Sequence, residues 1–207
     1  MENIYTLLLK LEGPLQSWGY RSRFDHRDTA LEPTRSGITG LLCSAMGISR
    51  DEDITIFDNI TRMGVRVDRP GKLERDYHTA LEVIKADGSR PDTVVSERDY
   101  LADASFTVGL ESAKKDFLEI IAQAIQSPVW PLSLGRKSCP LSAHPIVEPQ
   151  NPVKTGKLED FLFIGEPGTR VVLENSDGER AQNDWPISFA DRQFKQRRLQ
   201  VTYIPVD

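Results

Sequence analysis

A long polar interruption between two strand-like segments constrains the fold of this chain more than any other feature. Residues 63–67 and 104–110 are both apolar and of strand length, and the second alternates large with small or polar side chains. The segment 69–103 between them carries charges of both signs, two prolines and the dipeptide Asp87-Gly88. At about 35 residues it is far too long for a plain hairpin loop. We therefore expect it to fold into a projection that joins two neighbouring strands.

The other elements of the first two thirds follow from apolar periodicity. Residues 4–12 predict a buried strand, and helices are predicted over residues 36–46 and 112–126, the second with Ser112 as its cap. A further strand is expected around residues 129–134. The resulting order of strand, helix, strand, strand, helix and strand is that of the ferredoxin-like βαββαβ fold, which the RNA-recognition motif shares.

The C-terminal third has a weaker pattern. Residues 171–173 and 199–203 look like strands, and residues 176–178 read as a turn. The Pro-rich stretch 145–152 is typical of a connector. The expected class is therefore α+β, with a small β-rich part at the C-terminal end.

Composition limits the class of protein further. A length of 207 residues suits one principal domain, and 39% apolar with 28% charged residues is typical of a globular protein. No apolar run approaches the roughly 18 residues of a membrane span, so no membrane association is expected. The first residues do not resemble a secretion signal, and Cys43 and Cys139 have no CxxC partners. These features predict a cytoplasmic protein.

A first candidate anion site lies where the first strand gives way to a Gly-rich loop at residues 13–20. Residues 33–37 then lead into the first helix, whose free N–H groups favour an anion such as phosphate. The net charge of −5 does not exclude such a site, because a few well-placed Arg and Lys side chains suffice to contact phosphates. The alternative is a turn with solvated arginines and a Trp at the edge of the core. The candidate residues are Trp18, Arg21, Arg23, Arg35 and Ser36.

A second cluster lies on both sides of the expected projection, at residues 75–79 and 97–100. Arginines beside aromatic residues suit single-stranded RNA, because a guanidinium contacts phosphate while a ring stacks on a base. The alternative is a solvated hairpin with alternating charges. The candidates here are Arg75, Tyr77, His78 and Arg98.

Two further basic segments follow. Arg136 and Lys137 come after Gly135, which allows backbone N–H groups to approach a ligand closely, although the spacing is not that of a Walker loop. Residues 192–198 form the most basic window and contain no acid, and a run of this length is usually an exposed face.

No arrangement typical of catalysis or metal binding is evident. The histidines His26, His78 and His144 are far apart in the sequence, and none belongs to an HExxH motif. GxSxG is absent, and the acidic residues are scattered. The sequence therefore predicts no metal, no cofactor and no catalytic residue.

Five motifs stand in order along the chain. They are GPLQSWG at 13–19, PTRSGITGLL at 33–42, RDYHT at 75–79, YLADASFTVGL at 100–110 and LGRKSCPL at 134–141. Together they resemble the CasD family, the Cascade subunit of type I-E CRISPR systems within the repeat-associated RNA-binding (RAMP) proteins. The resemblance covers residues 4–145 and returns around residues 187–201.

This resemblance implies a ferredoxin-like palm over residues 1–145, with a β-hairpin thumb at about 69–103, and a C-terminal extension over 146–207 packed on the palm. It implies that the chain binds the 5′ handle of the CRISPR RNA and caps the backbone of repeated subunits. The implied partners are that RNA, the backbone subunit and the large subunit, with target DNA reached only through the complex.

Two functions follow from these observations. The leading one is a binding subunit without catalysis. The alternative is a metal-independent endoribonuclease that processes precursor CRISPR RNA, as in some relatives, with Tyr77, His78 and Lys137 as the only candidate acid–base groups.

Overall fold

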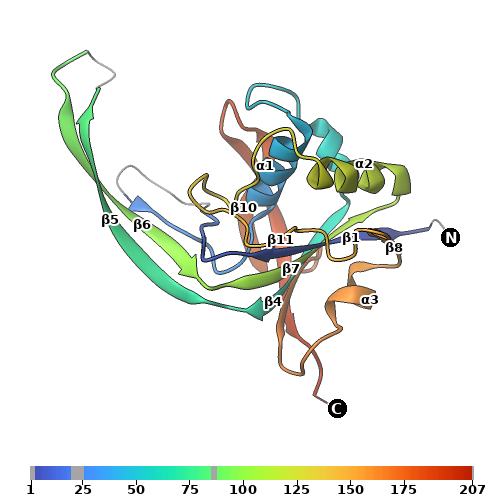
Figure 1. Ribbon diagram of the computed structural model, residues 1–207. Helices are drawn as coiled ribbons and strands as arrows, with labels where there is room; N and C mark the ends of the chain where they lie inside the picture. Colours follow the sequence, from blue (N-terminus) through green and yellow to red (C-terminus); the bar gives the residue numbers. More distant parts are fainter. Residues whose placement is uncertain (1–2, 20–25, 85–87, 207) are drawn as a thin grey trace.

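The computed structural model describes residues 3–19, 26–84 and 88–206. Its described strands form two sheets, one of seven strands and one of four (Figure 1). The strands are β1 (Tyr5–Glu12), β2 (Leu15–Gln16), β3 (His26–Arg27), β4 (Arg62–Arg69), β5 (Lys72–Val83), β6 (Asp92–Ala102), β7 (Ser105–Ser112), β8 (Val153–Thr155), β9 (Arg170–Glu174), β10 (Arg180–Ser188) and β11 (Gln193–Tyr203). The helices are α1 (Arg35–Met46), α2 (Lys115–Gln126) and α3 (Leu158–Leu162), with a short 3-10 helix at Thr55–Asn59.

The seven-stranded sheet has the order β10-β11-β9-β4-β7-β1-β8. Its recorded pairs are antiparallel throughout. The two strands predicted on either side of the long interruption are confirmed as β4 and β7, which pair with Val65 opposite Val108. The protein is therefore α+β, with mostly antiparallel sheets and few helices.

Helices α1 and α2 cover one face of this sheet (Figure 1). Helix α1 begins after Thr34, whose Oγ1 accepts a hydrogen bond from the N–H of Gly37 at 3.2 Å, and ends at Gly47 with φ of 73°. Both predicted helices are confirmed, but Ser112 does not cap the second one. Ser112 ends β7, and α2 begins after Lys114.

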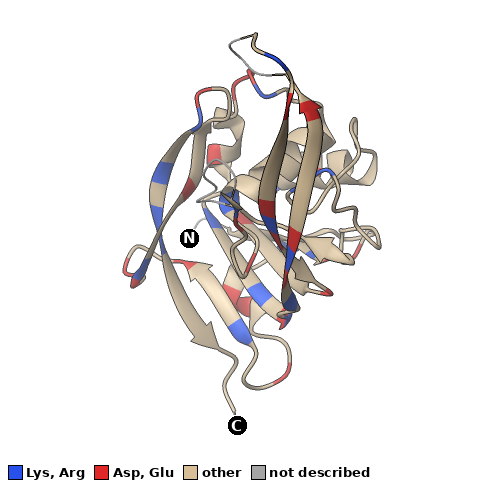
Figure 2. Cartoon of the chain, turned by 90° about the vertical axis from the view of Figure 1, so that its left-hand side faces the viewer, with Lys and Arg blue, Asp and Glu red and all other residues tan. Residues whose placement is uncertain are grey.

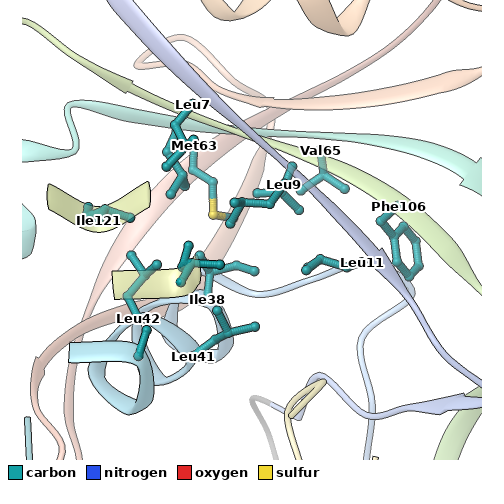
Figure 3. Packing of buried hydrophobic residues seen from close by; sticks show 14 of the residues in the cluster. Leu7, Leu9, Leu11, Ile38, Leu41, Leu42, Met63, Val65, Phe106 and Ile121 are labelled. Atoms are coloured by element: carbon teal, nitrogen blue, oxygen red, sulfur yellow. The ribbon is translucent and has the colours of Figure 1, made fainter. Parts of the chain in front are cut away.

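The main core lies between these helices and the sheet. Leu7, Leu9 and Leu11 of β1 point toward α1 and α2 (Figure 3), while Leu8 between them packs on the opposite face of the sheet. Strands β4 and β7 contribute to the same layer. The labelled residues are Leu7, Leu9, Leu11, Ile38, Leu41, Leu42, Met63, Val65, Phe106 and Ile121.

The short helix α3 packs on the opposite face of the sheet. Its buried Leu158 and Leu162 lie over Gly64 and Gly109, which are paired partners in β4 and β7. A Cβ at Gly64 would lie 2.5 Å from a methyl of Leu162, and one at Gly109 would lie 2.6 Å from a methyl of Leu158. The two glycines therefore form a shallow groove that admits the helix.

The strand expected at residues 129–134 is wrong. This segment runs past the end of α1, where the N–H groups of Val129 and Trp130 donate to the carbonyls of Ala45 and Ser44. Pro131 within it cannot donate to a ladder. The strand that adjoins β1 is instead β8, which places Thr155 opposite Tyr5.

The predicted projection is a long antiparallel hairpin of β5 and β6, which extends away from the sheet and helices (Figure 1). At its base β2 pairs with β6, and β3 pairs with β6 in parallel. The hairpin carries both acidic and basic residues (Figure 2). No helix in the described residues is both long and apolar enough to span a membrane.

A buried ion network joins α1 to the C-terminal strands. Arg197 donates to both carboxylate oxygens of Asp184, at 2.6 and 2.7 Å, and to Glu174 at 2.8 Å. Arg35 donates to the other oxygen of Glu174 at 2.6 Å and to the carbonyl of Ile60 at 2.6 Å. Two cations and two carboxylates thus balance each other in the protein interior.

We predict that Arg197→Leu lowers the free energy of unfolding by about 3–5 kcal/mol, because it leaves two buried carboxylates without one of their cations. Arg192→Leu removes an exposed arginine from the same strand region and should change it by less than about 0.5 kcal/mol. Equilibrium unfolding in urea measures both. Equal midpoints for the two variants would contradict the prediction.

Candidate nucleic-acid interface

The structure brings together three motifs that are far apart in the sequence: the loop after β1, the start of α1 and the loop at residues 134–137. The N–H of Ser17 donates to the carbonyl of Leu134 at 3.1 Å. Gly135 has φ of 87°, and a Cβ there would lie 1.8 Å from the carbonyl oxygen of Ser17. A Cβ on Gly37 would lie 2.7 Å from the ring of Trp18. Glycine is therefore required at both positions for the motifs to meet.

Two hollows lie at this junction. One, of about 260 Å³, is lined by Arg27, Arg136 and the aromatic rings of Phe189 and Phe194 among others. The other, of about 490 Å³, is lined in part by Lys137, and both include Ser36, Gly37, Gly135 and Phe189. Because they share these residues, they form one continuous surface with cations, a hydroxyl and aromatic rings.

Arg136 lies where the hairpin meets the rest of the protein. Its Nη2 donates to the carbonyl of Arg27 at 2.9 Å, and its guanidinium carbon lies 4.8 Å from the ring centroid of Tyr100 in β6. Its buried Nη1 has no hydrogen-bond partner among the described residues. The guanidinium is thus held in position by Arg27 and Tyr100. Lys137 beside it is exposed.

The base of the hairpin is held by a cluster around Asp99. Its carboxylate accepts from Arg75 Nε at 2.8 Å and lies 2.8 Å from His26 Nε2, while Arg75 also pairs with Glu97 at 3.1 Å. Burial alone would raise the pKa of Asp99, but the hydrogen bonds from Arg75 and His26 outweigh it and lower the pKa. Arg75 therefore has a structural role on this face of β5.

The other predicted hairpin residues are spread over both faces. Tyr77 is 69% exposed, whereas His78 is half-buried with Nδ1 3.8 Å from Asp76. As neighbours in one strand, Tyr77 and His78 point to opposite faces of the hairpin. Arg98 is half-buried and donates to Ser96 Oγ at 3.1 Å. It lies opposite Arg27 in the parallel β3–β6 ladder.

Two predicted site residues have interior positions. Trp18 is fully buried, and its Nε1 donates to Gln16 at 3.0 Å. Arg35 is 4% exposed, belongs to the ion network and stacks on Trp185 at 3.4 Å, and its burial lowers its pKa. Neither side chain reaches the surface, so the expectation that Arg35 meets phosphate is corrected. Arg21 and Arg23 lie outside the described residues.

Sequence reasoning missed the aromatic part of this surface. Phe189 and Phe194, on either side of the β10–β11 turn, pack edge to face with centroids 6.4 Å apart. Arg50 Nε donates to the carbonyl of Phe189 at 3.0 Å and fixes the turn against the end of α1. These residues fall within the 187–201 part of the resemblance, which was the only signal that could have found them.

Among the described residues that line this surface there is one thiol, and it is not prepared for nucleophilic attack. Cys43 lines the larger hollow, but burial raises the pKa of its thiol to about 11, so it stays protonated near neutral pH. In the part of the chain that the structure describes, no three His, Cys, Asp or Glu side chains are arranged to hold a metal ion.

Comparison with known proteins agrees with this arrangement. The family model described as CRISPR-associated protein (Cas5) matches residues 6–202. The CRISPR system Cascade subunit CasD of Escherichia coli (strain K12) is 36% identical over an alignment of 160 residues, and the match covers 68% of this chain and 68% of that one.

Two solved structures are similar along nearly the whole chain. A chain of a CRISPR RNA-guided surveillance complex has a TM-score of 0.81 and 30% identity, and the match covers 96% of this chain and 89% of that one. A crystal structure of a Cas protein has a TM-score of 0.77 and 38% identity, with 97% and 95% covered. Because the family model spans most of the sequence, this chain belongs to the CRISPR-associated Cas5 family.

Proposed function

We propose that this protein is a non-catalytic subunit of a type I-E Cascade surveillance complex that binds the 5′ handle of the CRISPR RNA. The observation that carries the proposal is the junction at which three family motifs meet and present Arg136 and Lys137 beside a hollow. Similarity to a Cascade subunit and to a chain of an RNA-guided surveillance complex supports it. The complex serves antiviral interference, and target DNA is met only through the assembly.

The fold supports a palm and a thumb. Strands β8, β1, β7 and β4 lie in that order with α1 and α2 on one face, as in a ferredoxin-like βαββαβ fold. The palm proposed here includes β8, so it extends beyond residue 145 into the C-terminal extension. The hairpin of β5 and β6 is the proposed thumb, and its partners are the guide RNA and the adjoining backbone subunit.

The proposed RNA-contacting residues are those near the junction and on the thumb. The sugar–phosphate backbone of the handle is contacted at the junction by Arg136, Lys137 and Ser36. Along the thumb it is contacted by Arg98, Tyr77 and His78. Arg75 acts through Asp99, as a support for the thumb base. The large subunit is proposed as a further neighbour of the palm.

A role as processing nuclease is not favoured. Tyr77 and His78 are on opposite faces of one strand, and Lys137 belongs to a separate loop beside α1. Acid–base cleavage needs two groups within reach of one phosphodiester. These three side chains do not converge in that way.

The first test concerns phosphate binding. Arg136→Gln combined with Lys137→Gln should weaken binding of the cognate handle and flatten its salt dependence by about 1.4 log units per log unit of salt, about 0.7 for each lost contact. Lys114→Gln with Lys115→Gln removes the same charge at the start of α2, and this pair should change neither the affinity nor its salt dependence. Fluorescence anisotropy at several salt concentrations measures both, and identical slopes would contradict the site.

The second test concerns the thumb. Replacing residues 76–97 by a short Gly-Ser link keeps the Arg75–Asp99–His26 cluster, so the palm should fold normally. The shortened protein should nevertheless fail to co-purify with guide RNA and the backbone subunit. Replacing only residues 83–91 is the control, and it should preserve more of the assembly. A full yield of loaded complex with the larger deletion would rule out the thumb as the gripping element.

The third test concerns catalysis. Purified protein incubated with its own repeat RNA in EDTA should leave the RNA intact, because no acid–base pair is assembled around one phosphodiester. Gel electrophoresis of end-labelled RNA is the measurement. Cleavage that disappears in His78→Ala or Lys137→Ala would show instead that the protein is a nuclease.

A further inference from the structure

Asp99 in β6 is bonded to its surroundings through both its side chain and its main chain. Its buried carboxylate accepts a hydrogen bond from Nε of Arg75 in β5 and lies 2.8 Å from Nε2 of His26 in β3. Its carbonyl accepts a hydrogen bond from Ser17 Oγ at 3.0 Å. One buried residue at the base of the thumb therefore connects β3, β5 and the loop after β1.

The side chain of Asp99 is connected to Arg136 through β3. His26 is the first of the two residues of this strand, and Arg27 is the second. The carbonyl of Arg27 accepts a hydrogen bond from Arg136 Nη2 at 2.9 Å. Because β3 is so short, its ladder with β6 and the contact between His26 and Asp99 fix where that carbonyl lies.

The main chain gives a second connection to Arg136. Ser17, whose hydroxyl is bonded to Asp99, also lies against Gly135, where a Cβ would be 1.8 Å from the Ser17 carbonyl oxygen. Tyr100 follows Asp99 in β6, and its ring centroid lies 4.8 Å from the guanidinium carbon of Arg136. The residue before Arg136 and the ring beside its guanidinium thus both depend on the placement of Asp99.

We propose that Asp99 is a positioning residue that holds Arg136 where it contacts RNA, so that the base of the thumb and the junction bind the handle as one unit. The inference rests on the proposed handle binding and deepens it, because it identifies what orients one of the cations. Asp99 is an acid, and an acid repels phosphate. Simple electrostatics therefore predicts that its removal strengthens RNA binding, whereas the positioning role predicts that its removal weakens binding.

The first measurement is fluorescence anisotropy of the full chain with the cognate handle RNA at several salt concentrations. Asp99→Ala should weaken binding roughly tenfold, as expected for one lost hydrogen bond to a charged group. It should also flatten the salt dependence by about 0.7 log unit per log unit of salt, as Arg136→Gln does. Asp99→Asn keeps one acceptor and should have a smaller effect. Glu74→Ala removes an exposed acid from the same hairpin and should not weaken binding.

A double-mutant cycle separates positioning from a general loss of structure. In the Arg136→Gln background, Asp99→Ala should change the Kd by less than about twofold, because the contact that it positions is already absent. Additive losses would overturn the proposal, as would tighter or unchanged binding by Asp99→Ala when Arg136→Gln weakens it. If thermal unfolding shows that Asp99→Ala unfolds early, His26→Ala replaces it, and its effect should also vanish in the Arg136→Gln background.

The second measurement needs no RNA. The ¹⁵Nε resonance of Arg136, assigned by its loss in Arg136→Gln, should shift in Asp99→Ala and stay in place in Glu74→Ala. An unmoved resonance in Asp99→Ala would overturn the positioning role. If Arg136→Gln leaves handle binding unchanged, the proposed handle contact fails, and this resonance alone decides whether Asp99 positions Arg136.

Discussion

The packing of the C-terminal strands against α1 depends on the buried ion pairs among Arg35, Arg197, Glu174 and Asp184. The network connects the start of α1 with β9, β10 and β11, and Glu174 also accepts from the backbone N–H of Met63 in β4. Desolvating four charges is costly, and only the complete set of hydrogen bonds offsets that cost. The network therefore fixes the C-terminal strands on the sheet and sets where the first turn of α1 presents Ser36.

The same network explains where sequence reasoning succeeded and failed. Strands β4 and β7, both helices and the hairpin carry local periodicity or spacing, so they were predictable. The role of Arg35 was not, because its partner Glu174 is 139 residues away. Strand β8 was missed because its three residues are too few for a periodic pattern. The segment 129–134 was predicted as a strand because it is apolar, but it contacts the end of α1 instead.

The candidate site was predictable only as separate pieces. Arg136 and Lys137 follow Gly135, which must be glycine because the backbone of Ser17 lies against it. The sequence alone does not indicate that contact. The aromatic pair of the β10–β11 turn completes the surface from the far end of the chain. The opposite face of the sheet, which RNA-recognition motifs use for RNA, is here covered by α3 where β4 and β7 meet.

The pairing of β8 with β1 has a consequence for synthesis. Strand β1 leaves the ribosome well before the segments that close its outer edge, which are residues 142–147 along its second half and β8 along its first half. The ion network closes later still, when Arg197 is available. A nascent chain of this protein thus carries the open edge of β1 over a long stretch of synthesis, and Glu174 then lacks Arg197 until 23 further residues are made. Its folding therefore depends on slow, long-range closure, and the chain is vulnerable to aggregation before β11 is complete.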